Sequence, residues 1–235
     1  MRLRLTFTKG EAMRFTGHLD LHRAWERTFR RARLPLAYTL GFHPQPRIQL
    51  AGALPLGFTS ECELADVWLE EDIAADVALA ALRVASPPGI VITAAEIVGD
   101  RLPPLQVLLR SADYVVRLEH PCANLSDRIA DVLAAASLPR VRRDKAYDLR
   151  PLIESLTWAA GDTPVLQMRL AARDAATGRP EEVVDVLGCN PDGAHYHRAA
   201  LILAESPAPV EAPGPSTPNE PDAIDGPPPA PDLEP

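Results

Sequence analysis

The chain has 235 residues, of which 46% are hydrophobic, and a formal net charge of -8. This length is enough for one large domain or for two small domains with proper cores. No apolar run approaches the roughly 20 residues that a membrane span needs, and no basic apolar leader opens the sequence, so we expect a soluble, cytoplasmic protein without membrane contact.

The charge is distributed unevenly along the chain. Residues 1–50 hold ten Lys or Arg against three Asp or Glu, whereas residues 205–235 hold seven acids, eleven prolines and no base. The first 204 residues therefore carry a net charge of only about -1. Because the acidic segment lacks apolar periodicity, we predict a disordered tail at 205–235. It is interpreted as a solubilising end, with shielding of a basic surface as the alternative.

The three cysteines, Cys62, Cys122 and Cys189, lie far apart and show no paired ligand spacing. This pattern indicates neither a disulfide framework nor a zinc or iron-sulfur site. We expect three buried, reduced thiols, no bound metal and no cofactor.

Hydrophobic periodicity and turn residues predict the element order βαββαβ in the first half of the chain. The predicted segments are a strand at 3–8, a helix at 18–33, extended stretches at 47–53 and 61–70, a helix at 73–85 and a strand at 90–98.

The same order is predicted again in the second half. Its segments are a strand at 112–120, a helix at 124–136, extended stretches at 148–158 and 164–173, a helix at 180–187 and a strand at 196–203. The simplest architecture is an α+β fold of two tandem ferredoxin-like units, at 1–100 and 106–204, followed by the disordered tail at 205–235. Residues 101–106, with Pro103 and Pro104, form the predicted linker.

The predicted helix at 18–33 is amphipathic. Leu21, Trp25 and Phe29 fall on one side, because each residue advances about 100° around the axis. The arginines fall on other sides and are candidate phosphate-binding residues, since guanidinium groups bind phosphate in a bidentate way. They are Arg23, Arg27, Arg30 and Arg31. The alternative interpretation is an ordinary solvated helix face.

A second candidate binding element is the loop from Gly41 to Arg47. Pro44 and Pro46 hold the preceding residues extended. The loop then offers a stacking surface, hydrogen-bonding groups and a cation, which suit a nucleotide or another planar polar ligand. These groups are Phe42, His43, Gln45 and Arg47. The alternative is that Phe42 belongs to the core and that the prolines only shape a connection.

His18 and His22 are four residues apart, so both can lie on one side of the helix start. An HxxxH pair alone is weak evidence for a metal, and a hydrogen-bonded structural histidine is the more common case. We therefore assign no metal site. His18 and His43 remain weak candidates for general acid-base catalysis, which also requires a partner at the reacting proton.

Several motifs follow one another in a recognisable order. Between residues 9 and 66 the chain contains HLDL, LPLAY, a GF-x-P-x-P loop and ALPLG, and near its end it contains GRPEEVVDVLG and HRAALIL. In this order they resemble the radical SAM-linked proteins, a bacterial domain of unknown function that is fused to, or encoded beside, radical SAM enzymes. The resemblance covers residues 1–204. The family typically has an apolar residue in place of His22 and often asparagine in place of His43.

The resemblance implies a partner, a radical SAM enzyme with a cobalamin-binding-type region. The chain has no set of three closely spaced cysteines for a radical SAM cluster, so it is not expected to be that enzyme itself.

Three functional hypotheses follow. The preferred one is a non-catalytic accessory or substrate-recruitment module, with RNA as the candidate ligand of the basic helix and the GFHPQPR loop. The alternatives are an RNA-processing or RNA-modifying enzyme that uses His18 or His43, and a purely structural docking partner.

Overall fold

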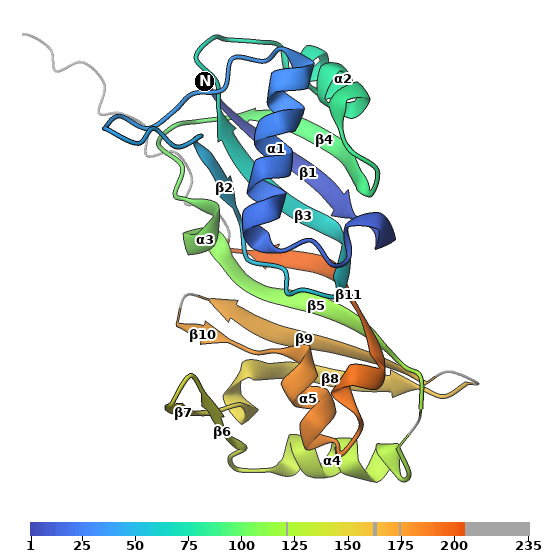
Figure 1. Ribbon diagram of the computed structural model, residues 1–235. Helices are drawn as coiled ribbons and strands as arrows, with labels where there is room; N and C mark the ends of the chain where they lie inside the picture. Colours follow the sequence, from blue (N-terminus) through green and yellow to red (C-terminus); the bar gives the residue numbers. More distant parts are fainter. Residues whose placement is uncertain (121, 162–163, 174, 205–235) are drawn as a thin grey trace, which may run out of the picture.

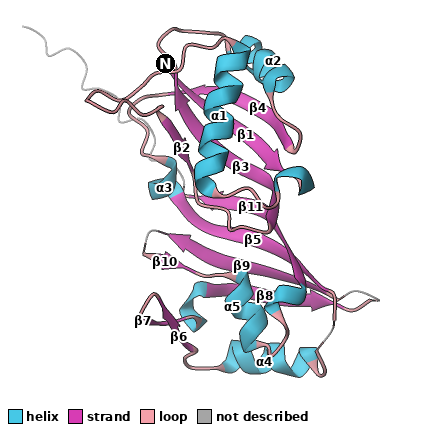
Figure 2. Ribbon diagram, viewed as in Figure 1, coloured by secondary structure: helices cyan, strands magenta, loops and turns pink. Residues whose placement is uncertain are grey.

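The computed structural model describes residues 1–120, 122–161, 164–173 and 175–204, and the predicted disordered tail at 205–235 lies outside the described residues. The described chain has a mixed α+β fold, with a nine-stranded, mostly antiparallel sheet and five α-helices (Figures 1 and 2). Helices α1 and α2 cross the face of one half of this sheet, and α5 crosses the other half (Figure 1). No helix in this part of the chain is both long and apolar enough to cross a bilayer.

Every helix and strand predicted for the first half is present, with ends that differ by a few residues. In chain order the elements are β1 (Arg2–Lys9), α1 (His18–Ala32), β2 (Ile48–Leu50), β3 (Phe58–Trp68), α2 (Ala75–Ala85) and β4 (Ile90–Val98). Their strands lie in the order β4-β1-β3-β2, and all neighbours are antiparallel.

The second half has a corresponding arrangement. Its main elements are β5 (Leu109–Leu118), α4 (Leu125–Ala134), β8 (Ile153–Ala159), β9 (Val165–Arg173), α5 (Pro180–Val186) and β11 (Ala194–Leu203). Their strands lie in the order β11-β5-β9-β8, again antiparallel throughout. In each half, the last strand in the chain lies beside the first, and the third and then the second strand follow. The two halves therefore have the same strand order.

The structure adds short elements that the sequence pattern did not predict. They are α3 (Leu105–Leu108), a hairpin of β6 (Pro139–Arg142) and β7 (Lys145–Asp148), and β10 (Ala176–Thr177). The predicted extended stretch at 148–158 begins later than expected, because residues 150–152 form a 3₁₀ turn with a proline at its start.

Helix α1 follows the predicted phase. Leu21, Trp25 and Phe29 are buried, and Trp25 meets Phe7 of β1 edge to face, with ring centroids 4.8 Å apart. The helix ends at Arg33, which adopts a left-handed conformation with φ of 57°. Burying each large side chain contributes about 1.5–3 kcal/mol, so this face anchors α1 to the sheet.

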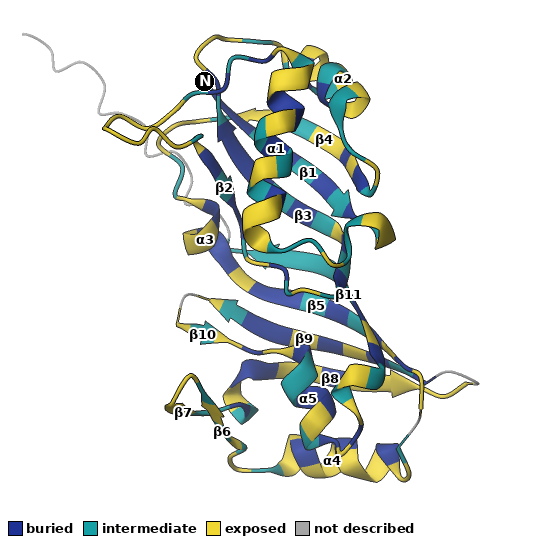
Figure 3. Ribbon diagram, in the orientation of Figure 1, coloured by how far each residue is buried: buried dark blue, intermediate teal, exposed yellow. Residues whose placement is uncertain are grey.

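The core forms two clusters of buried side chains, one in each half of the sheet (Figure 3). The cluster of the second half includes Phe58 from β3, whose ring stacks on Tyr196 of β11 with centroids 4.6 Å apart. Here β11 runs parallel to β3, with Tyr196 opposite Phe58 and Arg198 opposite Ser60. This pairing joins the two halves into one sheet.

Buried charges lie beside this junction. The Arg198 guanidinium donates to Glu63 of β3, with Nε 2.8 Å from Oε1, and both residues are almost completely buried. Nearby, Lys9 donates from Nζ to the carbonyls of Arg14 and Phe58, each at 3.1 Å. Burial lowers the pKa of Lys9, and the Glu63 carboxylate counteracts part of that effect.

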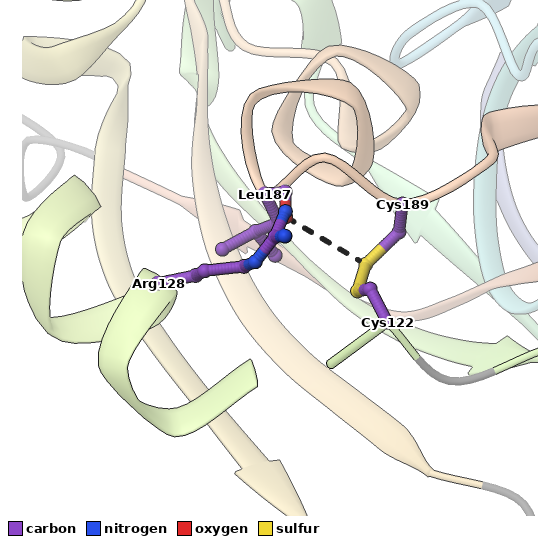
Figure 4. Close-up of a disulfide and its surroundings, with 4 residues drawn as sticks. All are labelled: Cys122, Arg128, Leu187 and Cys189. Atoms are coloured by element: carbon purple, nitrogen blue, oxygen red, sulfur yellow. Dashed lines mark hydrogen bonds between the residues drawn. A yellow bond between two sulfur atoms is a disulfide. The ribbon is translucent and has the colours of Figure 1, made fainter. Parts of the chain in front are cut away.

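The cysteines differ from the expectation of three reduced thiols. Cys122, just before α4, and Cys189, just after α5, form a disulfide with Cα atoms 5.4 Å apart (Figure 4). The prediction is wrong for this pair because 67 residues separate the two cysteines, and only the packing of α4 and α5 brings them together. Arg128 links the same two elements by donating to the Leu187 carbonyl at 2.7 Å. Cys62 is free, and burial raises the pKa of its thiol to about 11.

Replacing Arg198 with methionine should destabilise the fold, because Glu63 would remain buried without its partner. We expect the free energy of unfolding to fall by about 3–5 kcal/mol, measured by urea denaturation with circular dichroism. The double variant Glu63→Leu/Arg198→Met removes both charges and should recover part of that loss. A loss below about 1 kcal/mol in the single variant would show that the junction does not depend on this pair.

Candidate functional site

The segment of residues 37–47 forms a narrow loop that is closed at its base. Arg47 donates its backbone N–H to the Ala37 carbonyl at 2.9 Å, and Thr39 donates to the Gln45 carbonyl at 2.9 Å. Gln45 in turn donates its backbone N–H to Thr39 Oγ1 at 2.9 Å. These bonds hold the two sides together, and Gly41 allows the turn at the tip with φ of +133°.

Two large apolar side chains stand at the tip of this 37–47 loop. Leu40 and Phe42 are fully exposed, with relative accessibilities of 101% and 102%. Phe42 is therefore not a core residue, contrary to one part of the alternative interpretation of the loop. His43 is also exposed at the tip.

The four arginines predicted to bind phosphate are all exposed on α1 (Figure 3). Arg23 and Arg30 contact acids of the same helix, Asp20 at 3.3 Å and Glu26 at 3.0 Å. Such exposed pairs contribute at most about 1 kcal/mol, so an incoming phosphate can displace them. We call Arg23, Arg27, Arg30 and Arg31 the arginine row.

A hollow of about 450 Å³ lies between the first turns of α1 and the base of the 37–47 loop. It brings together three residues that the sequence analysis considered separately, His18, Arg23 and Gln45. The complete lining of this loop–helix hollow is His18, Leu19, His22, Arg23, Glu26, Gln45, Pro46 and Ile48.

Other predicted site residues lie outside this hollow. Phe42 and His43 project from the loop tip and are not among its lining residues. Arg47 stacks on Trp68, with its guanidinium carbon 4.6 Å from the ring centroid. Arg31 lines a different, shallow groove between α1 and α2. The predicted site residues therefore lie in three places, which are the hollow, the protruding loop tip and the arginines outside the hollow.

His18 and His22 lie next to each other in the hollow, with ring centroids 4.7 Å apart. Burial, and then the neighbouring His18, lower the pKa of His22. The described residues contain no group of three His, Cys, Asp or Glu side chains arranged to hold a metal ion.

The structure also shows a cleft that the sequence analysis did not identify. It has a volume of about 360 Å³ and lies between the loop after β2 and the segment before α5. Its three arginines, Arg173, Arg179 and Arg198, are isolated in the sequence, so no local pattern signals them.

The lowering of the His22 pKa can be tested by NMR titration of the imidazole rings. We expect His22 to titrate below the ordinary value of about 6.5, and we expect its pKa to rise in His18→Gln, which removes the neighbouring positive charge. Because the folded-state pKa lies below the unfolded one, protonation of His22 should destabilise the fold as the pH falls below about 6.5. A His22 midpoint at or above 6.5 would contradict the observed geometry.

Comparisons with known proteins identify a family. No curated protein matches the chain. Among solved structures, it is similar to an archaeal box H/ACA sRNP Nop10-Cbf5 complex, with 13% identity and a TM-score of 0.39 over 83% of this chain and 46% of that one. A Cbf5-Nop10-Gar1 complex matches with 13% identity and a TM-score of 0.42, over 87% and 48%.

An unknown protein from Galdieria sulphuraria matches with 12% identity and a TM-score of 0.27, over 86% of this chain and 98% of that one. The chain spans about half the length of the two complex-derived chains. Structural likeness at this level supports no functional argument. In contrast, residues 2–180 match DUF2344, described as an uncharacterized protein conserved in bacteria. The chain therefore belongs to this uncharacterized bacterial family.

Proposed function

We propose that the chain is a non-catalytic recruitment module that binds RNA on the surface formed by the arginine row and the 37–47 loop, and that it acts with a radical SAM enzyme. The observation that carries this proposal is the full exposure of Phe42 on a braced loop whose base lines the same hollow as Arg23 of the arginine row. An exposed aromatic ring and exposed guanidinium groups suit single-stranded RNA, because a base stacks on the ring while phosphates bind the cations.

The loop–helix hollow adds groups that can recognise a base or a sugar. His18 and Gln45 carry hydrogen-bonding atoms at its wall, and Arg23 adds a positive charge. These groups support recognition of a ligand by hydrogen bonds and charge.

The enzymatic alternative has less support from the geometry. General acid-base catalysis by His18 or His43 requires a second group at the same reacting atom. His43 stands at the loop tip and is not part of the hollow that contains His18. An acid-base partner for His43 would thus have to come from the ligand or from the partner protein, whereas His18 shares its hollow with His22 and Glu26.

The radical SAM enzyme as partner rests on the resemblance of the sequence motifs. One structural feature favours direct docking on a protein as the second candidate function. Leu40 and Phe42 both project fully into solvent, and exposed apolar side chains that stand together commonly mark protein contacts.

We also propose that the two halves are tandem ferredoxin-like units at 1–100 and 106–204. The support is the repeated strand order, β4-β1-β3-β2 and β11-β5-β9-β8, together with one hydrophobic cluster in each half. Residues 101–106 would then connect the units. Arg2 fastens this connection by donating to the carbonyls of Leu102 at 2.6 Å and Pro103 at 3.1 Å.

RNA binding can be tested with a 12-nucleotide single-stranded RNA by fluorescence anisotropy at several salt concentrations. Each phosphate contact contributes about -0.7 to the slope of log K against log salt. We therefore expect Arg23→Gln/Arg27→Gln to reduce the slope by about 1.4 and to weaken binding at 50 mM salt by roughly tenfold.

Arg143→Gln is the matched control, because Arg143 is exposed in the turn between β6 and β7, which form a separate two-stranded sheet in the second half of the chain. It should leave both the slope and the affinity nearly unchanged. If the native chain does not bind RNA at low salt, or if the double variant keeps the native slope, the RNA proposal is wrong.

Protein docking can be tested separately at the loop tip. Leu40→Ser/Phe42→Ser should abolish co-purification with a radical SAM enzyme, identified by mass spectrometry, without changing the melting temperature, because both side chains are fully exposed. Val141→Ser, at an exposed apolar residue of β6, is the control and should keep the partner. Recovery of the same enzyme with the tip variant would exclude the tip as the contact.

A further inference from the structure

The cleft between the loop after β2 and the segment before α5 lies where the two halves of the sheet meet, and we call it the central cleft. One wall is the loop that follows β2, and the other is the segment between β9 and α5 (Figure 1). The lining residues are Ala51, Gly52, Ala53, Pro55, Gln106, Leu109, Tyr114, Ala172, Arg173, Thr177, Gly178, Arg179, Pro180 and Arg198. Its volume of about 360 Å³ is in the range of small-ligand sites, which are typically about 300–1,000 Å³.

The lining of the central cleft carries three arginines and no acid. Arg198 is buried and neutralised by Glu63, which is not part of the lining. Arg173 and Arg179 are exposed, and neither has a carboxylate within 4.0 Å among the residues that the structure describes. Among the residues that the structure describes, the lining of the cleft therefore carries two guanidinium groups without a salt-bridge partner, and the Glu181 carboxylate is near enough to Arg179 to interact with it at longer range.

The loop that forms the first wall is held in place by several contacts. Gln106 donates from Nε2 to the Leu50 carbonyl at 2.6 Å, and Arg198 lies 3.4 Å from the carbonyls of Gly52 and Ala53. A Cβ atom on Gly52 would lie only 2.9 Å from a methyl carbon of Leu109, so any side chain here would displace that methyl group. The cleft is thus shaped by contacts within the protein before any ligand arrives.

The remaining lining is mostly apolar, and it includes Leu109 and Pro180. An apolar wall with a few convergent polar groups is typical of a site for a small organic molecule. The planar guanidinium binds two oxygens of a phosphate group in a bidentate way, and two such cations match the double negative charge of a phosphate monoester.

We propose that the central cleft binds a small phosphate ester, with Arg173 and Arg179 on the phosphate and the apolar wall against its organic part. This site is separate from the arginine row on α1, and it does not depend on RNA binding there. The two guanidinium groups come from opposite ends of the segment that joins β9 to α5. A bound phosphate would therefore tie this segment together across the mouth of the cleft.

The test is isothermal titration calorimetry of the full chain with AMP, using adenosine as the uncharged comparison. We expect AMP to bind and adenosine to bind at least tenfold more weakly. Arg173→Gln/Arg179→Gln should weaken AMP binding by tenfold or more, and each single variant should have an intermediate effect. Arg101→Gln, an exposed arginine outside the cleft, should change AMP binding less than twofold.

Circular dichroism of the double variant must show a native spectrum, which is expected because both arginines are exposed. The proposal is overturned if AMP does not bind at millimolar concentration and low salt, or if the double variant binds AMP as tightly as the native chain. It is also overturned if the double variant loses only affinity for RNA, since the arginines would then contact an RNA backbone. Failure of RNA binding at α1 alone leaves the AMP result unaffected.

Discussion

The parallel pairing of β11 with β3, supported by the buried ion pair of Arg198 and Glu63, is the contact on which the arrangement of the molecule depends. Without it the chain would form a four-stranded and a five-stranded sheet, because all other ladders of this sheet are formed within one half. A buried ion pair stabilises little compared with apolar side chains, but a mispaired register would leave both charges without a partner. We infer that the pair favours one register for the last strand, and Arg198 also contacts the Gly52 and Ala53 carbonyls of one cleft wall.

Some arginines of this chain are paired with buried acids and others lie in solvent. A count of arginines in the sequence does not distinguish the two groups. Arg2 and Arg4 both contact Asp66 on the sheet, and Arg198 contacts Glu63, so these three are structural and almost fully paired. Those of the arginine row lie in solvent with weak partners or with none that the described residues supply. The arginine row on α1, and Arg173 and Arg179 at the wall of the central cleft, are exposed and can therefore be reached by a ligand.

The parts of the candidate site that depend on residues close together in the chain could be predicted from the sequence, and the parts that depend on distant residues could not. The helical phase of Leu21, Trp25 and Phe29 placed the arginines on the solvent side, since α-helical periodicity is local. The two prolines likewise indicated a shaped loop, and the structure shows Phe42 at its exposed tip. The hollow between helix and loop was not predictable, because the position of Gln45 beside His18 results from how the loop folds back on α1.

The local sequence pattern therefore predicts the α+β class, the order of the main helices and strands, and which face of α1 is apolar. Each of these features depends on residues that are close together in the chain. Long-range packing alone determined the continuous sheet, the disulfide of Cys122 with Cys189 and the grouping of Arg173, Arg179 and Arg198. These features join residues that lie far apart in the chain, and no short-range periodicity records which distant segments meet.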